Sequence, residues 1–275
     1  MGAGFESKSS NWFSWFIQLP QLESITLHRL PDYPWHFQAR SSGPKRLTLT
    51  DRRHSTVYTS EVEDVLKAFP MLDCLDATWS FGAHHSSVEW AELGAAVTRH
   101  GSNLRKLTLN YYRGMHGSSD VQSNQTNLAS LKHLRELTLP VEALLPETPR
   151  VYTPPPFDEF DPEYYGYSPE DEDDRSDSQA PAVEIPPVPL CRLLPHSLQH
   201  LIIMDDFYLW ADTVRLDEEL RSLMLDPQFS ELRAIRVRRR NPWSEHAKDL
   251  GWHEERYGHY WNALLRPGSL SDSDT

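Results

Sequence analysis

The chain has 275 residues, which is enough for one large domain or two small ones. Its formal net charge of -13 at pH 7 argues against a general nucleic-acid binder, which would normally be basic. The two cysteines, Cys74 and Cys191, provide neither a disulfide framework nor a zinc site, which fits a reducing compartment. We therefore expect an intracellular protein, cytoplasmic or nuclear, that binds no metal and no other cofactor.

The first apolar stretch, residues 11–20, is too short to span a bilayer. It lacks the basic stretch and the small-residue cleavage site of a signal peptide, so we expect no secretion and no membrane partner. Within it, Trp12, Trp15, Phe16 and Leu19 have the spacing of one helix face. This spacing predicts a helix that packs on the strand following it.

A short frame, Leu-x-x-Leu-x-Leu, recurs along the chain. Its clearest copies are SNLRKLTLNYY at residues 102–112 and KHLRELTLPVE at residues 132–142. The last aliphatic positions of seven copies are Leu27, Leu49, Ala77, Leu109, Leu139, Ile203 and Val237. Successive positions differ by 22, 28, 32, 30, 64 and 34 residues, so with one exception the period is about 30 residues, which is typical of a stacked solenoid.

The frame predicts a short strand, because its last two aliphatic residues alternate and therefore point to one side. One such strand cannot bury its apolar face alone, but neighbouring strands stacked in a parallel sheet can. Between the strands, residues 60–69, 87–100 and 216–225 carry apolar residues at helical spacing. The first two begin with capping-box patterns, and the third stops before a proline. We therefore expect helix–turn–strand units, forming an α/β solenoid with a parallel sheet on its concave side and helices on its convex side.

The frame and its period resemble a leucine-rich repeat. FPMLDCL at residues 69–75 and LPHSLQHLII at residues 194–203, with irregular spacers, are similar to the divergent repeats of fungal F-box/leucine-rich-repeat proteins. The resemblance covers roughly residues 12–240 and implies substrate recognition for a ubiquitin ligase, with ligase subunits among the partners. The chain departs from that family because no F-box precedes its repeats and no Asn or Cys regularly follows the last leucine.

The longest gap between copies contains residues 146–189, where prolines and acidic residues dominate. Such a segment buries too little apolar surface to offset its ordering entropy, so we expect a disordered insertion. Ser168 precedes a proline, and Ser176 and Ser178 lie among acidic residues, so these three serines are candidate phosphorylation sites. The insertion is therefore a solvated loop, a regulatory segment, or a tether that folds onto the basic residues 232–240.

The insertion sets the expected domain boundaries. Residues 1–145 contain repeats one to five, and residues 190–240 contain repeats six and seven. Residues 241–275 form an aromatic C-terminal cap followed by a disordered tail.

Catalytic motifs are missing from the sequence: it has no Gly-x-Ser-x-Gly elbow, no Walker-type loop and no dinucleotide fingerprint. His84 and His85 lie in a loop without a cysteine or acidic residue at metal-ligand spacing. An enzyme remains an alternative only if His84, His85 and His116 converge with an acidic residue. Cys74 falls within a strand, which favours a small sheet residue over a nucleophile.

A partner surface follows from strand alternation, because residues between the buried aliphatics face the other side of the sheet. The expected partner-binding residues on this face are Thr26, Thr48, Asp76, Thr108, Thr138, Ile202, Arg236 and Arg238. We predict a non-catalytic protein–protein interaction module that uses this face. The alternatives are an enzyme with its site on the strand-to-helix loops and a purely structural repeat protein.

Overall fold

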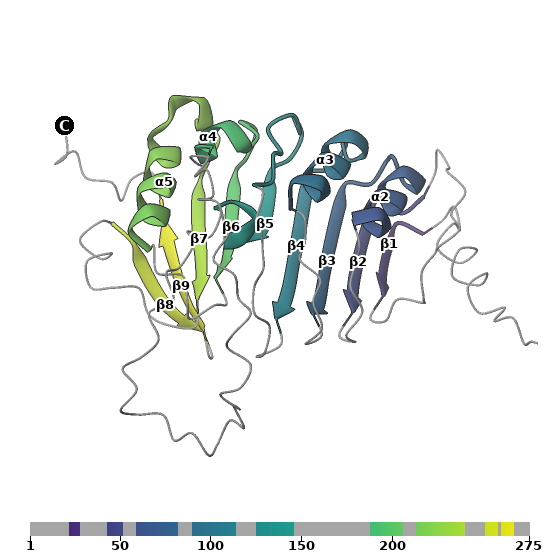
Figure 1. Ribbon diagram of the computed structural model, residues 1–275, viewed down its shortest axis with the longest axis horizontal. Helices are drawn as coiled ribbons and strands as arrows, with labels where there is room; N and C mark the ends of the chain where they lie inside the picture. Colours follow the sequence, from purple (N-terminus) through teal and green to yellow (C-terminus); the bar gives the residue numbers. More distant parts are fainter. Residues whose placement is uncertain are drawn as a thin grey trace, which may run out of the picture. The chain divides into compact units, whose positions relative to one another are not determined.

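The computed structural model describes residues 22–27, 43–51, 59–81, 90–113, 125–145, 188–205, 213–239, 251–257 and 260–266. All of them belong to one compact unit, made of Met1–Glu147 and Val188–Thr275. The described residues form a nine-stranded sheet with the order β1-β2-β3-β4-β5-β6-β7-β9-β8 (Figure 1). None of the helices among them combines the length and apolar character needed to cross a membrane. The acidic insertion and the N-terminal residues 12–19 lie outside the described residues.

Seven parallel strands follow one another in chain order, each at a copy of the repeated frame. They are β1 (Ser24–Leu27), β2 (Arg46–Asp51), β3 (Cys74–Phe81), β4 (Lys106–Arg113), β5 (Glu136–Pro140), β6 (His200–Asp205) and β7 (Ala234–Arg239). Every neighbouring pair among them is parallel. The predicted parallel sheet of an α/β protein is therefore confirmed.

The longer helices occur where the apolar spacing predicts them. They are α2 (Thr59–Ala68), α3 (Trp90–His100) and α5 (Thr213–Leu225), and the shorter ones are η1 (Val141–Ala143), α4 (Leu190–Leu193) and η5 (Pro227–Phe229). A uniform helix–turn–strand unit is nevertheless wrong for β5, because residues 125–135 leading into it form turns. Ser60, which begins the capping-box pattern of residues 60–69, is the second residue of α2 rather than the residue before it.

The hydrophobic core lies on one face of the sheet. Its two central rows are Ile25, Leu47, Leu75, Leu107, Leu137, Leu201 and Ile235, and Leu49, Ala77, Leu109, Leu139, Ile203 and Val237. Each of these side chains is at most 5% exposed. Buried residues of α2, α3, α4 and α5 belong to the same hydrophobic cluster, so the helices cover this face (Figure 1). The strand residues between the core positions point to the opposite side, which we call the open face.

A repeated turn precedes each of the five strands from β3 to β7. In this turn, the N–H of the first leucine of the frame donates a hydrogen bond to the carbonyl oxygen of the residue three positions earlier, at 2.8–3.2 Å. The donors are Leu72, Leu104, Leu134, Leu198 and Leu232. The acceptor residue in this turn is Phe69, Gly101, Leu131, Pro195 or Phe229. If Gly101 were replaced by another residue, the added Cβ atom would lie 2.7 Å from both Leu104 Cδ1 and the Val97 carbonyl oxygen. This close approach explains why glycine occupies this turn.

A ladder of backbone hydrogen bonds connects each turn to the next. In every step, two consecutive N–H groups donate to one carbonyl of the preceding repeat, and the accepting residues are Glu23, Lys45, Asp73, Arg105, Arg135 and Gln199. Across the acidic insertion, Gln199 and His200 donate to the Arg135 carbonyl at 2.8 and 2.9 Å. Arg135 and Glu136 donate to Arg105 at 2.8 and 3.0 Å, so the insertion leaves the stacking geometry unchanged.

The residues expected as an aromatic cap extend the sheet with an antiparallel hairpin. It consists of β8 (His253–Tyr257) and β9 (Tyr260–Leu265), and β9 pairs with β7. Ala263 and Leu265 continue the two core rows beside Val237 and Ile235. Trp252, just before β8, is buried in the same cluster and donates through Nε1 to the Asp217 carboxylate of α5. These two strands were not predicted from the sequence.

Candidate functional site

The central row of the open face contains the residues that the sequence assigns to it. Its members in strand order are Thr26, Thr48, Asp76, Thr108, Thr138, Ile202 and Arg236. Each lies directly opposite the next on the neighbouring strand, and Leu264 of β9 follows Arg236. All are exposed or half-buried, in contrast to the core rows on the other face.

A second row flanks the first at the entry of the strands. It runs through Ser24, Arg46, Cys74, Lys106, Glu136, His200 and Ala234. Lys106 Nζ and Glu136 Oε2 lie 2.7 Å apart across two strands. This hydrogen bond to Glu136 is the main reason why the pKa of Lys106 is raised. The middle of the open face is thus a charged surface whose two ions compensate each other.

Two half-buried groups of β3 lie beside this ion pair. Burial raises the pKa of the Asp76 carboxyl, against the opposing effects of Lys106 and of Thr78, whose Oγ1 donates to Asp76 Oδ1 at 3.5 Å. Burial also raises the pKa of the Cys74 thiol, which keeps the sulfur protonated and unreactive near neutral pH. The geometry therefore provides a polar contact surface rather than an activated nucleophile.

The open face is not accessible along its whole width. The third row includes Asn110 of β4 and Met204 of β6, which are only 7% and 6% exposed. Met204 follows Ile202 by two residues and so lies on the open face by alternation, yet it is buried, since alternation fixes the direction of a side chain but not what lies over it. The Oδ1 atom of Asn110 is also buried and accepts no hydrogen bond in the described part of the chain.

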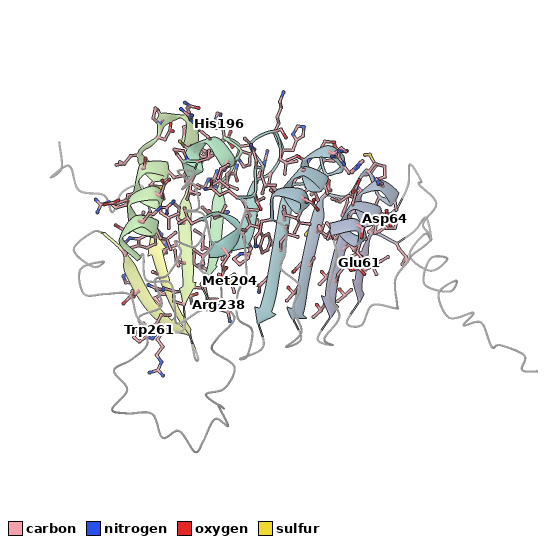
Figure 2. The ribbon with its side chains drawn as sticks, viewed as in Figure 1. Glu61, Asp64, His196, Met204, Arg238 and Trp261 are labelled. Atoms are coloured by element: carbon pink, nitrogen blue, oxygen red, sulfur yellow. The ribbon has the colours of Figure 1, made fainter. Side chains whose placement is uncertain are left out.

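The C-terminal end of the open face has a different chemistry. Arg236 of β7 is exposed and lies between the half-buried Ile202 of β6 and Leu264 of β9. Arg238 lies two residues further along β7, between Met204 and Asn262. Figure 2 shows Met204 and Arg238 toward the carboxyl ends of β6 and β7. This end of the face combines arginine with aliphatic side chains.

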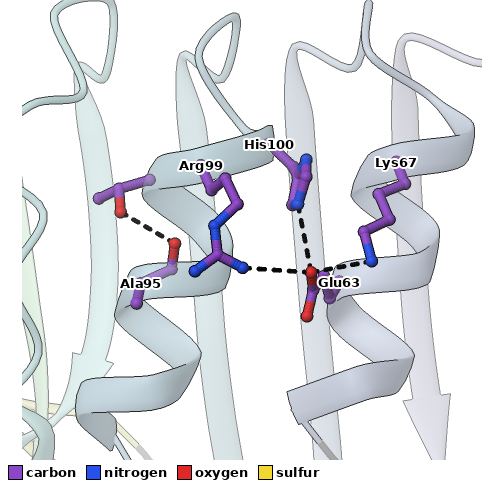
Figure 3. Close-up of polar contacts among 6 residues, drawn as sticks. Glu63, Lys67, Ala95, Arg99 and His100 are labelled. Atoms are coloured by element: carbon purple, nitrogen blue, oxygen red, sulfur yellow. Dashed lines mark hydrogen bonds and ion pairs between the residues drawn. The ribbon is translucent and has the colours of Figure 1, made fainter.

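The helix side carries an ionic cluster that the sequence did not reveal. Glu63 Oε1 of α2 lies 2.8 Å from Lys67 Nζ, 3.2 Å from His100 Nε2 and 3.4 Å from Arg99 Nη1 (Figure 3). The hydrogen bond from Lys67 is the main cause of the lowered pKa of Glu63, with smaller contributions from His100 and Arg99 of α3. The cluster joins two neighbouring helices, and its partly exposed ion pairs contribute only weakly to the contact between consecutive repeats.

The remaining sequence candidates fall outside the part of the chain that the structure describes. His84, His85 and His116, and the serines Ser168, Ser176 and Ser178, lie outside the described residues. Among the residues that the structure describes, no group of three or more His, Cys, Asp or Glu side chains could hold a metal ion. Comparison of the chain with protein-family models, curated proteins and solved structures finds no match.

Proposed function

We propose that the chain is a leucine-rich-repeat-like solenoid that binds a protein partner on its open face and performs no chemistry itself. The observation that carries this proposal is the division of the sheet into two faces. Helices and core residues occupy one face, whereas two rows of polar and charged side chains remain accessible on the other. Stacked repeats generally use such extended surfaces for recognition.

The dimensions of the open face suit a peptide or a protein edge. Seven strands about 4.8 Å apart give each row a length of roughly 29 Å, which matches about nine residues of extended chain. The row contains hydroxyl groups of Thr48, Thr108 and Thr138, which can both donate and accept hydrogen bonds. The Lys106–Glu136 pair adds one charge of each sign near the middle.

The resemblance to F-box/leucine-rich-repeat proteins gives the proposal a finer form. In that form the partner is a ubiquitin-ligase substrate, and ligase scaffold subunits purify together with the chain. The support for it is the repeat frame itself, now seen as seven parallel strands in chain order. Co-purification of the tagged chain followed by mass spectrometry tests this finer form separately from the docking surface.

The docking surface is tested by quantitative capture with matched variants. Thr48→Arg and Thr108→Arg place a bulky cation on the open face, and Ala95→Arg places the same side chain on an exposed position of α3. All three must retain the wild-type circular dichroism spectrum. We expect partners of the wild-type chain to be lost from both open-face variants and kept by Ala95→Arg. Equal capture by all variants contradicts the proposal, because the partner must then bind another surface, whereas no specific capture by the wild-type chain favours a purely structural repeat protein.

A further inference from the structure

An unusual arginine environment lies at the C-terminal end of the open face. Arg236 stands directly between Ile202 and Leu264 on the neighbouring strands. Its side chain is exposed, and it makes no hydrogen bond or ion pair with another described residue. Aliphatic side chains therefore flank this guanidinium on both sides, and the described residues supply no counter-ion. The guanidinium is available for a ligand.

The other charges of the open face differ from Arg236. Lys106 is paired with Glu136 at 2.7 Å, and Asp76 is half-buried and contacts Thr78. Arg46 is exposed like Arg236, but its row neighbours are Ser24 and Cys74 instead of two aliphatic residues. Arg46 is therefore a matched control for a cation on the same face without the apolar surroundings.

The wider surroundings of Arg236 include one acidic side chain on the same face. Glu255 of β8 lies on the same face as Arg236, two strands away, and its Oε1 atom is 3.5 Å from His253 Nε2. His200 of β6 lies two residues before Ile202, and Arg238 of β7 lies two residues after Arg236. An anion approaching Arg236 thus finds one further guanidinium, that of Arg238, on the same strand and one carboxylate near the sheet edge.

We infer that this place binds an acidic peptide, with a carboxylate on Arg236 and apolar side chains on Ile202 and Leu264. The inference rests on the proposed function and names the chemistry of the partner. The planar guanidinium can donate two parallel hydrogen bonds to one carboxylate. Apolar peptide side chains covering Ile202 and Leu264 remove water from this ion pair, which strengthens it.

Binding is measured by fluorescence anisotropy on the full chain. The probe is a fluorescein-labelled peptide, Gly-Leu-Asp-Glu-Leu-Asp-Gly, and its neutral counterpart has Asn and Gln in place of the acids. We expect the acidic probe to bind and to lose affinity when salt is raised. Arg236→Gln should weaken binding at least about tenfold, as expected for loss of a charge-assisted hydrogen bond, and Arg46→Gln less than about twofold.

Several outcomes overturn the inference. They are no binding of the acidic probe to the wild-type chain, equal binding of the neutral probe, and equal losses in Arg236→Gln and Arg46→Gln. If the probe binds only after residues 150–187 are deleted, the occupant is the acidic insertion of the chain itself, and the separate partner is excluded. A captured protein that is lost with Thr108→Arg but kept with Arg236→Gln removes this inference while the proposed function stands.

Discussion

Replacing Leu107 with alanine is expected to be among the more costly single changes in the sheet. Its side chain is 0% exposed and lies in register between Leu75 and Leu137, which are 0% and 1% exposed. Leucine-to-alanine changes in cores cost about 2–5 kcal/mol, and the cost rises with the cavity that remains. Both neighbours lie in strands paired with β4, so the cavity can collapse little, and we expect a loss of about 3–4 kcal/mol.

The adjacent Thr108 provides the matched control, because it belongs to the same strand but to the open face. Thr108→Ala removes a half-buried side chain and should cost less than about 1 kcal/mol. Urea unfolding of both variants, followed by far-UV circular dichroism and tryptophan fluorescence, gives the free energies of unfolding. A cost below about 1 kcal/mol for Leu107→Ala, or equal costs for the two variants, would refute the division of the sheet into a core face and an open face.

Three further changes test other contacts. Gly94→Ala should lower the free energy of unfolding by about 1 kcal/mol despite the higher helix propensity of alanine, since its Cβ would lie 2.8 Å from Thr126 Cγ2; a raised thermal midpoint contradicts this. Glu63→Gln should cost under about 1 kcal/mol at pH 7. Because the contact with Lys67, and to a lesser degree His100 and Arg99, lowers the pKa of Glu63, this difference should vanish as the pH falls through the lowered pKa, and a difference that grows in acid argues against the cluster. Trp252→Phe removes the hydrogen bond to the Asp217 carboxylate and should cost about 1.5–3 kcal/mol in urea unfolding, whereas a neutral effect would show that the hairpin does not depend on this contact.

The repeat frame predicted the sheet because burial and hydrogen bonding both follow it. Leu109 and Leu139 occupy equivalent positions 30 residues apart, and both are fully buried in the same core row. The same frame placed β6 beside β5 despite the long insertion between them. Periodicity gives the order of repeats independently of spacer length, since each repeat contacts mainly its neighbours.

The hairpin of β8 and β9 was not predicted from the sequence, and the reason is physical. The sequence of β8, HEERY, has no apolar alternation, because β8 is the edge strand and most of its described side chains point into solvent. In β9, Ala263 and Leu265 do alternate, but the period of the repeat had already ended. Edge strands with polar sequences carry little information about pairing, so only the fold reveals them.

Contacts between distant side chains were equally hidden from the sequence. Glu63 belongs to the capping-box pattern at the start of residues 60–69, but its carboxylate contacts Arg99 and His100 of α3, 36 and 37 positions later. The burial of Met204 and the isolation of Arg236 also depend on neighbouring strands. Alternation predicted the face on which each residue lies, whereas the exposure and the charge pairing of each side chain are known only from the three-dimensional structure.

The most direct test of the open face is site-specific photo-crosslinking in cells. A benzophenone amino acid is introduced at Thr138 on the open face or at the exposed Ala95 on α3, and crosslinked proteins are identified by mass spectrometry. We expect discrete protein adducts from position 138, and we expect none of these proteins to be crosslinked from position 95. Adducts from position 95 alone would place the interaction surface on the helices and contradict the account.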